Sequence, residues 1–124
     1  MESCLLNIRQ FLLTEGITRM LEEGIFDIHC HIVPGVDDGA ADIEETRKLL
    51  EMEYKQGVRN IILTPHFRFQ MFETSLEKVQ RQFRLAEEAA ADISKDLHLY
   101  LGCEFHANME MLPMLREKKV STML

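Results

Sequence analysis

The chain has 124 residues, enough for one domain with a modest hydrophobic core and too few for several. Apolar residues make up 46% of it, which is typical of a globular protein and argues against disorder. The formal net charge of −7, without a long basic cluster, argues against nucleic acid as a partner, because neutralising phosphates requires a basic surface.

The cysteines and the N-terminal segment indicate the compartment. Cys4, Cys30 and Cys103 are odd in number and lack Cys-x-x-Cys spacing, which argues against a disulfide framework and for the reducing cytoplasm. Residues 1–24 have no basic n-region and their apolar run is interrupted by polar residues, so we expect neither a signal peptide nor membrane insertion. Apolar residues at helical spacing predict an N-terminal helical extension there, followed by one domain over residues 25–124.

The domain begins with a strand and a helix. The apolar run at residues 25–28 predicts the first strand. A helix is expected from about Asp42, whose side chain can cap the first turn while Glu45 reaches back as the capping-box partner. Gly57 suits the position just beyond the end of this helix.

The same alternation continues to the end of the chain. Residues 58–63 are rich in β-branched side chains and predict a second strand. Thr74, with Glu77 three residues later, predicts the N-cap of a second helix. Residues 97–101 predict a third strand and residues 110–119 a third helix. This order implies an α/β fold of three βα units with right-handed crossovers and a parallel sheet.

Candidate metal ligands follow each of the three predicted strands. His29 and His31 follow the first strand and, two residues apart in extended chain, project from the same face. His66 follows the second strand and Glu104 the third. Because the carboxyl ends of parallel strands gather at one edge, we expect these four side chains to meet around a divalent cation.

Other candidates have competing interpretations. Asp38 lies in a Pro-Gly-Val-Asp-Asp-Gly stretch that is also good turn chemistry. Arg68 could hold a phosphate with its planar fork or be a solvated surface arginine. Asp27 shares the predicted histidine face and could orient a ligand, whereas Cys30 should point into the core.

These residues resemble a known family. The stretch from Asp27 to Ala40 is similar to the opening of the bacterial metal-dependent tyrosine phosphatases of the polymerase-and-histidinol-phosphatase (PHP) superfamily, which are associated with capsule and exopolysaccharide synthesis. The similarity continues through four short segments, at residues 56–58, 64–66, 71–74 and 102–104. Cysteine-dependent tyrosine phosphatases resemble one another in a Cys-x5-Arg loop, and no cysteine of this chain is followed by arginine at that spacing.

The resemblance implies a fold, a metal cluster and a substrate. It implies the N-terminal half of a distorted (β/α)7 TIM-like PHP barrel with up to three divalent ions, often manganese. In that pattern His29 and His31 bind one ion, Glu104 bridges it to a second, and Asp38 and His66 belong to a third. The implied substrate is the phosphotyrosine tail of a bacterial tyrosine autokinase that regulates polysaccharide export, with Arg68 as the candidate catalytic, phosphate-holding residue.

The chain differs from this family in its length, and this difference leaves several interpretations of its function open. About 24 residues precede the first strand, and the chain stops roughly halfway along the family pattern, before a later Asp-x-His motif. The expectation is therefore a partial PHP domain, which is a fragment, the product of a split or interrupted gene, or a chain that relies on a complementing C-terminal half or on self-association. The alternatives are another PHP-type phosphoesterase acting on a histidinol-phosphate-like substrate, and an inactive half that acts only by binding. An amidohydrolase-like enzyme is disfavoured, because neither Thr64 nor Gly102 is the lysine that such enzymes commonly carboxylate.

Overall fold

The main sheet has three parallel strands and is helix-covered on one side. The computed structural model describes residues 24–68, 70–109 and 111–117, so the helix predicted within residues 1–24 lies almost wholly outside the described part. The strand order is β1 (Ile25–Cys30), β2 (Val58–Leu63) and β4 (His98–Leu101). This confirms the predicted alternation and the parallel sheet.

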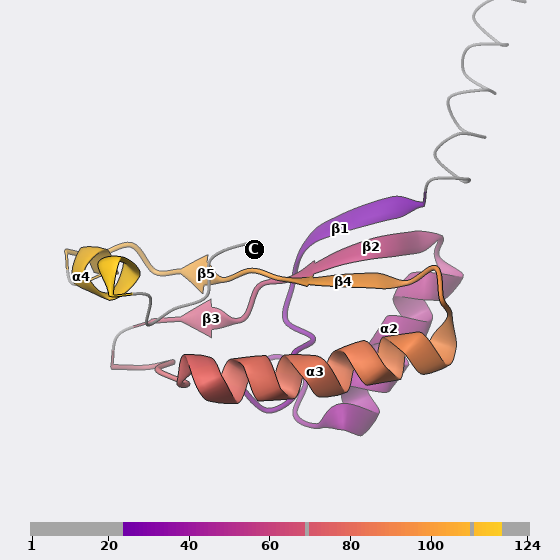
Figure 1. Ribbon diagram of the computed structural model, residues 1–124, viewed down its shortest axis with the longest axis horizontal. Helices are drawn as coiled ribbons and strands as arrows, with labels where there is room; N and C mark the ends of the chain where they lie inside the picture. Colours follow the sequence, from indigo (N-terminus) through magenta and orange to yellow (C-terminus); the bar gives the residue numbers. More distant parts are fainter. Residues whose placement is uncertain (1–23, 69, 110, 118–124) are drawn as a thin grey trace, which may run out of the picture.

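Two long helices make the crossovers. They are α2 (Ile43–Lys55), between β1 and β2, and α3 (Leu76–Ile93), before β4. Figure 1 shows both helices on the same side of the sheet. Among the described residues, no helix has the length and apolar character needed to cross a membrane.

The hydrophobic core lies between the sheet and these two helices. Full burial of an aliphatic side chain stabilises a fold by about 1.5–3 kcal/mol, so this layer is the main source of stability. Its largest fully buried apolar side chains are Leu50 from α2, Ile61 and Leu63 from β2, and Val33 from the loop after β1.

The opposite face of the sheet is partly uncovered in the described part of the chain. Phe26 and Ile28 on β1 are 59% and 70% exposed, and Tyr100 on β4 is 42% exposed. Parallel sheets are normally buried on both faces. These three apolar side chains therefore mark a surface that the described residues leave open.

The N-terminal end of α2 is built as the sequence predicts. The Asp42 carboxylate accepts a hydrogen bond from the backbone N–H of Glu45 at 2.9 Å, and the Glu45 side chain accepts one from the N–H of Ala41 at 2.8 Å. Gly57 follows the helix with a φ of +95°, a left-handed conformation that favours glycine. These contacts confirm the predicted cap and the predicted end of the helix.

The predicted cap of α3 is wrong by one residue. Ser75 is the N-cap, and its hydroxyl oxygen accepts from the N–H of Lys78 at 3.3 Å. Thr74 instead donates its hydroxyl to the carbonyl of Val36 at 2.7 Å. Both residue types suit an N-cap, so the tertiary contact to the loop after β1 decides between them.

A second, two-stranded parallel sheet continues beyond the main sheet, and the sequence did not predict it. It pairs β3 (His66–Phe67) with β5 (Glu104–Phe105), and His66 lies directly opposite Glu104 in the register. The short helix α4 (Met111–Arg116) follows and contributes Met111 to a small cluster with Phe67. Figure 1 shows this layer past the ends of β2 and β4.

The loop after β1 folds back against the strand that it leaves. The carbonyl of His31 accepts from the N–H of Ala40 at 2.9 Å. A Cβ atom placed on Gly39 would lie only 2.0 Å from that carbonyl oxygen, so this close approach requires glycine. As a result, residues 37 and 38 return to the carboxyl end of β1.

Candidate metal centre

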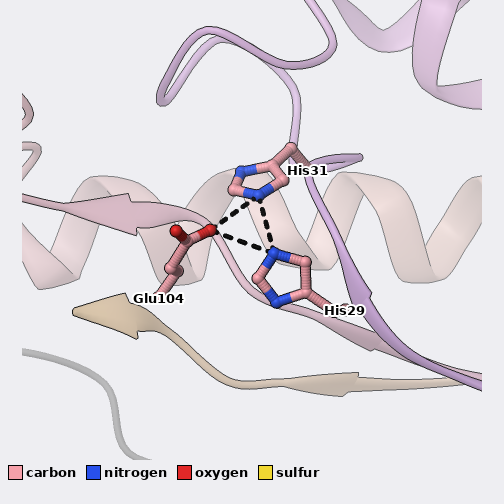
Figure 2. A group of neighbouring side chains, drawn as sticks. All are labelled: His29, His31 and Glu104. Carbon is pink, nitrogen blue, oxygen red and sulfur yellow. Dashed lines mark hydrogen bonds and ion pairs between the residues drawn. The ribbon is translucent and has the colours of Figure 1, made fainter. Parts of the chain in front are cut away.

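Two imidazoles and one carboxylate converge on one point. The Nε2 atoms of His29 and His31 each lie 3.0 Å from Oε2 of Glu104, and the two Nε2 atoms are 3.3 Å apart. Figure 2 shows the two rings and the carboxylate turned toward one another. His29 lies in β1, His31 directly after it, and Glu104 opens β5. The end of β1 and the start of β5 thus bring together residues that are far apart in the sequence.

The spacing of these three atoms suits a divalent cation. Ligands at about 2.1 Å from a six-coordinate ion are about 3.0 Å apart along a cis edge. The three atoms are separated by 3.0, 3.0 and 3.3 Å, close to that value. Imidazole nitrogen suits ions such as iron and zinc, and carboxylate oxygen suits ions such as manganese, so this mixed donor set is compatible with all three. The donor set therefore fits the group that the resemblance implies.

An irregularity in β1 directs the side chains at its end. Asp27 pairs with Ile61 and Cys30 with Leu63, so β1 has one more residue than β2 over this stretch. Such a bulge bends a strand and re-aims its side chains. The thiol of Cys30 turns into the core, 3.7 Å from the carbonyl of Ile62, as predicted, and burial raises its pKa to about 12.

Asp27 contacts the backbone rather than a ring. Its carboxylate accepts from the N–H of His29 at 3.0 Å. The expectation that it could orient an imidazole is therefore not met by this contact, because the hydrogen bond goes to the main chain. The extra residue in β1 changes the alternation on which that expectation was based.

A second group of ligands adjoins the first. The Nε2 atom of His66 lies 3.4 Å from Oδ1 of Asp38, and its Nδ1 atom lies 3.6 Å from Oε2 of Glu104. The rings of His31 and His66 are 4.4 Å apart between centroids. The side chain of Asp38 is 64% exposed. His31, Asp38 and His66 thus form a second set of atoms that can hold a cation, beside the set of His29, His31 and Glu104.

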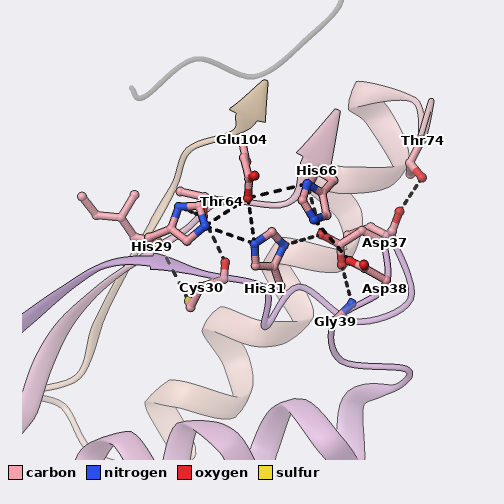
Figure 3. Close-up of polar contacts among 12 residues, drawn as sticks. His29, Cys30, His31, Asp37, Asp38, Gly39, Thr64, His66, Thr74 and Glu104 are labelled. Carbon is pink, nitrogen blue, oxygen red and sulfur yellow. Dashed lines mark hydrogen bonds and ion pairs between the residues drawn. The ribbon is translucent and has the colours of Figure 1, made fainter. Parts of the chain in front are cut away.

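Asp37 is a site residue that sequence reasoning missed. Its side chain is 0% exposed, and its Oδ2 atom lies 2.9 Å from Nδ1 of His31 and accepts from the N–H of His66 at 2.9 Å. Its Oδ1 atom accepts from the N–H of Gly39 at 3.0 Å. Figure 3 shows these contacts joining the two ligand groups. The sequence offered only turn chemistry for this residue.

Thr64 is the other site residue without a predicted role in the cluster. Its hydroxyl lies 3.2 Å from Nδ1 of His29 and donates to the carbonyl of Cys30 at 3.3 Å. Its position directly after β2, at the edge where the ligands gather, is a signal that could have identified it.

A pocket of about 400 Å³ opens beside the cluster. It is lined by ligand candidates, apolar side chains and two basic residues, namely Asp38, His66, Arg68, Met71, Phe72, Glu104, Phe105 and His106. The Phe72 ring stacks on His66, with centroids 5.2 Å apart and planes at 13°. Arg68 is exposed at this pocket, and its guanidinium lies 3.6 Å from the sulfur of Met71.

Comparison with known proteins identifies the family. Residues 25–124 match the family described as capsular polysaccharide synthesis, CpsB/CapC. The chain belongs to this family. This confirms the resemblance recognised in the sequence.

Individual relatives place the chain within that family. It is 40% identical over 99 residues to the tyrosine-protein phosphatase CpsB of Streptococcus pneumoniae, a match covering 80% of this chain and 41% of that protein. It is 48% identical over 42 residues to the tyrosine-protein phosphatase YwqE of Bacillus subtilis, covering 34% of this chain and 16% of that protein.

A solved structure also resembles this one. It comes from work on YwqE of Bacillus subtilis and CpsB of Streptococcus pneumoniae, described as unique metal-dependent tyrosine phosphatases. The TM-score is 0.70 at 27% identity, covering 80% of this chain and 40% of the other. The family match therefore extends to the fold, and the chain spans less than half the length of these relatives.

Proposed function

We propose that this chain supplies the N-terminal part of the active site of a metal-dependent protein-tyrosine phosphatase of capsular or exopolysaccharide synthesis. The observation that carries the proposal is the convergence of His29, His31 and Glu104 on one point, with 3.0 Å between each imidazole and the carboxylate. The similarity to proteins named tyrosine-protein phosphatase supplies the reaction class.

The proposed ligand sets follow the two groups of side chains. His29 and His31 would hold one divalent ion together with Glu104, and Glu104 would also contribute to a second. Asp38 and His66 would contribute to a third. Manganese is the preferred candidate, because the family resemblance implies it and carboxylate oxygens suit it. Such a cluster, when bound, would acidify water and neutralise phosphate charge.

Arg68 is the proposed phosphate-binding residue of this half of the site. It lines the same pocket as His66, Asp38 and Glu104, and its side chain is exposed there. A planar guanidinium binds two phosphate oxygens at once, which fixes the phosphate and offsets charge as the ester bond breaks.

The proposed substrate is the phosphotyrosine tail of a bacterial tyrosine autokinase in the cytoplasm. Met71, Phe72 and Phe105 give one side of the pocket an apolar lining that suits an aromatic ring. Tyrosine leaves as a phenolate whose ordinary pKa is about 10, so the demand on a general acid is mild.

The proposed context is a larger barrel. We place residues 25–124 in a partial PHP domain, three βα units of a (β/α)7 barrel, and residues 1–24 in a helical extension. The exposed Phe26, Ile28 and Tyr100 are the surface that the rest of such a barrel would cover. The C-terminal part of such a barrel is the preferred occupant, and a second copy of the chain is the alternative.

The test measures metal content and hydrolysis separately. The purified chain is loaded with manganese and assayed on a phosphotyrosine peptide and a small phosphate ester. Both assays are repeated with a separately expressed polypeptide matching the C-terminal part of the pneumococcal relative. We expect manganese binding by the chain alone and peptide hydrolysis in the mixture.

A matched pair of variants makes the test specific. Glu104→Gln should lower manganese affinity at least 10-fold, because it removes the negative charge of the carboxylate that lies 3.0 Å from both imidazoles. Glu88→Gln, on the exposed surface of α3, should bind like the unmodified chain. Metal binding without turnover in any mixture would favour a binding-only protein, and turnover of the small ester alone would favour another phosphoesterase.

A further inference from the structure

We infer that Asp37 is a positioning residue that sets the tautomer of His31 and ties both ligand groups together. The inference rests on the proposed function, because it concerns how the same side chains are prepared for a cation. It assigns to Asp37 a role that its turn-forming sequence context does not indicate.

The contact with His31 determines where the ring proton lies. An ionised carboxylate is only an acceptor, so at 2.9 Å from Oδ2 the Nδ1 atom of His31 must be the donor. In a neutral imidazole the proton on Nδ1 leaves a lone pair on Nε2. That Nε2 atom faces Glu104 and the Nε2 atom of His29. Asp37 therefore aims the metal-binding lone pair at the point of convergence.

The same carboxylate also fixes the second ligand group. Oδ2 accepts from the backbone N–H of His66 at 2.9 Å, which anchors the start of β3 to the end of β1. Oδ1 accepts from the N–H of Gly39 in the loop after β1. A fully buried carboxylate is costly unless its acceptor sites are used, and three donors compensate it here.

A purely structural role for Asp37 makes a different prediction. A residue that only holds the turn needs acceptors for the N–H groups of Gly39 and His66, and Asp37 supplies them with its two different oxygens. Asparagine has one carbonyl oxygen, which we expect to stay on Gly39 two residues on, as in an Asx turn. Its N–H2 group then takes the place of Oδ2, faces Nδ1 of His31 and leaves the N–H of His66 without that acceptor. The ring would then carry its proton on Nε2, where a cation needs the lone pair. A purely structural role predicts lower stability in Asp37→Asn without this change of tautomer, so the position of the ring proton separates the two roles.

The experiment reads the His31 tautomer directly. Protein labelled with 15N-histidine is studied without metal at pH 8 by long-range 1H–15N NMR, and His31→Gln assigns the His31 signals. We expect a proton on Nδ1 in the unmodified chain and a bare Nδ1 in Asp37→Asn. Zinc serves as the probe ion in calorimetry, and its affinity should fall about 10–100-fold in the variant.

Asp27→Asn is the matched control. Asp27 also accepts from a backbone N–H beside a ligand, that of His29, through one hydrogen bond to the main chain. This variant should keep the proton on Nδ1 of His31 and bind zinc within about 2-fold of the unmodified chain, since losses of 10-fold or more are typical where a ligand's partner is removed.

The outcomes are decisive in each case. A bare Nδ1 in the unmodified chain overturns the inference, even if Asp37→Asn does not fold. A change of tautomer in Asp37→Asn without loss of affinity, or a loss without a change of tautomer, also overturns it. If no form of the chain binds zinc, the proposed metal site fails, whereas the tautomers still decide the role of Asp37.

Discussion

The hydroxyl oxygen of Thr64 lies 3.2 Å from the Nδ1 atom of His29 and 3.3 Å from the carbonyl oxygen of Cys30. A hydroxyl has a single proton, and when it donates this proton to the carbonyl of Cys30, its oxygen accepts from Nδ1 of His29. In that arrangement the Nε2 atom of His29, which lies 3.0 Å from Oε2 of Glu104, keeps its lone pair for a cation.

Thr64→Val should weaken metal binding with little effect on the fold. Valine has nearly the shape of threonine but leaves Nδ1 of His29 without its partner, and loss of such partners costs about 10-fold or more in metal affinity. Zinc titration calorimetry measures this. Thr74→Val is the control, because its hydroxyl bonds the carbonyl of Val36 instead. Equal zinc affinities for the two variants would refute the role of Thr64.

Thr46→Val should destabilise the protein by about 1–3 kcal/mol, because a buried carbonyl would lose its donor. The fully buried Thr46 hydroxyl lies 2.8 Å from the carbonyl of Ile32 and bridges α2 to the loop after β1. The measurement is urea unfolding followed by circular dichroism.

Arg47→Ala, at the neighbouring position, is the comparison for Thr46→Val. Arg47 pairs with Asp92 at 3.1 Å, with side chains 37% and 67% exposed. Exposed pairs contribute about 0–1 kcal/mol, so this variant should unfold at nearly the original urea concentration. A larger effect for Arg47→Ala than for Thr46→Val would contradict the assignment of the buried contact.

Gly39→Ala should be the more harmful of two glycine substitutions in the loop after β1. Its new methyl group would meet the carbonyl oxygen of His31 at 2.0 Å, so the backbone must move, at a cost of about 2–4 kcal/mol. Gly35→Ala meets only the carbonyl of Ala41 at 3.3 Å and pays for its φ of +64°, about 1–2 kcal/mol. Unfolding free energies that rank the other way would disprove the close approach.

The half-buried thiols of Cys30 and Cys103 should make stability fall at alkaline pH. Burial raises the pKa of Cys30 and of Cys103 to about 12, from an ordinary value of 9.0. Between those values the unfolded chain releases thiol protons that the folded chain keeps, so stability is full below pH 9 and is lost as the pH rises toward 12.

Urea unfolding at pH 8 and at pH 10.5 measures this loss. The double variant Cys30→Ala, Cys103→Ala should lose less stability between the two pH values than the unmodified chain does. An identical decrease in both proteins would show that the thiols do not account for it. Iodoacetamide at pH 8 should also alkylate both thiols more slowly in the folded protein than in urea, because the thiolate is the nucleophile.

The regular elements could be predicted because their signals are local. β2 has the predicted bounds, and α2 begins at Asp42 and ends before Gly57 as expected. The first strand runs two residues further than predicted, to Cys30. The ladder of β3 and β5 could not be predicted, since two-residue strands carry no periodicity and depend on pairing between distant segments.

The residues of the candidate site likewise divide into those that could be predicted from the sequence and those that could not. His29, His31, His66 and Glu104 could be gathered from sequence because each lies near or just beyond the carboxyl end of a strand of one parallel sheet. The contacts of Asp37 and Thr64 could not, since they depend on how the loop after β1 folds back and on an extra residue within β1. Neighbouring aspartates in a turn look alike in sequence, yet one is buried and the other is 64% exposed.

The pairing of His66 with Glu104 gives the cluster a shared vulnerability. Each of the two ligand groups includes one member of this pair, so both groups depend on the same short backbone ladder. A substitution that breaks this ladder would displace His66 and Glu104 together, even if it lies far from the ligand atoms. A substitution that separates β3 from β5 should therefore weaken cation binding by both ligand groups, and not by one group alone.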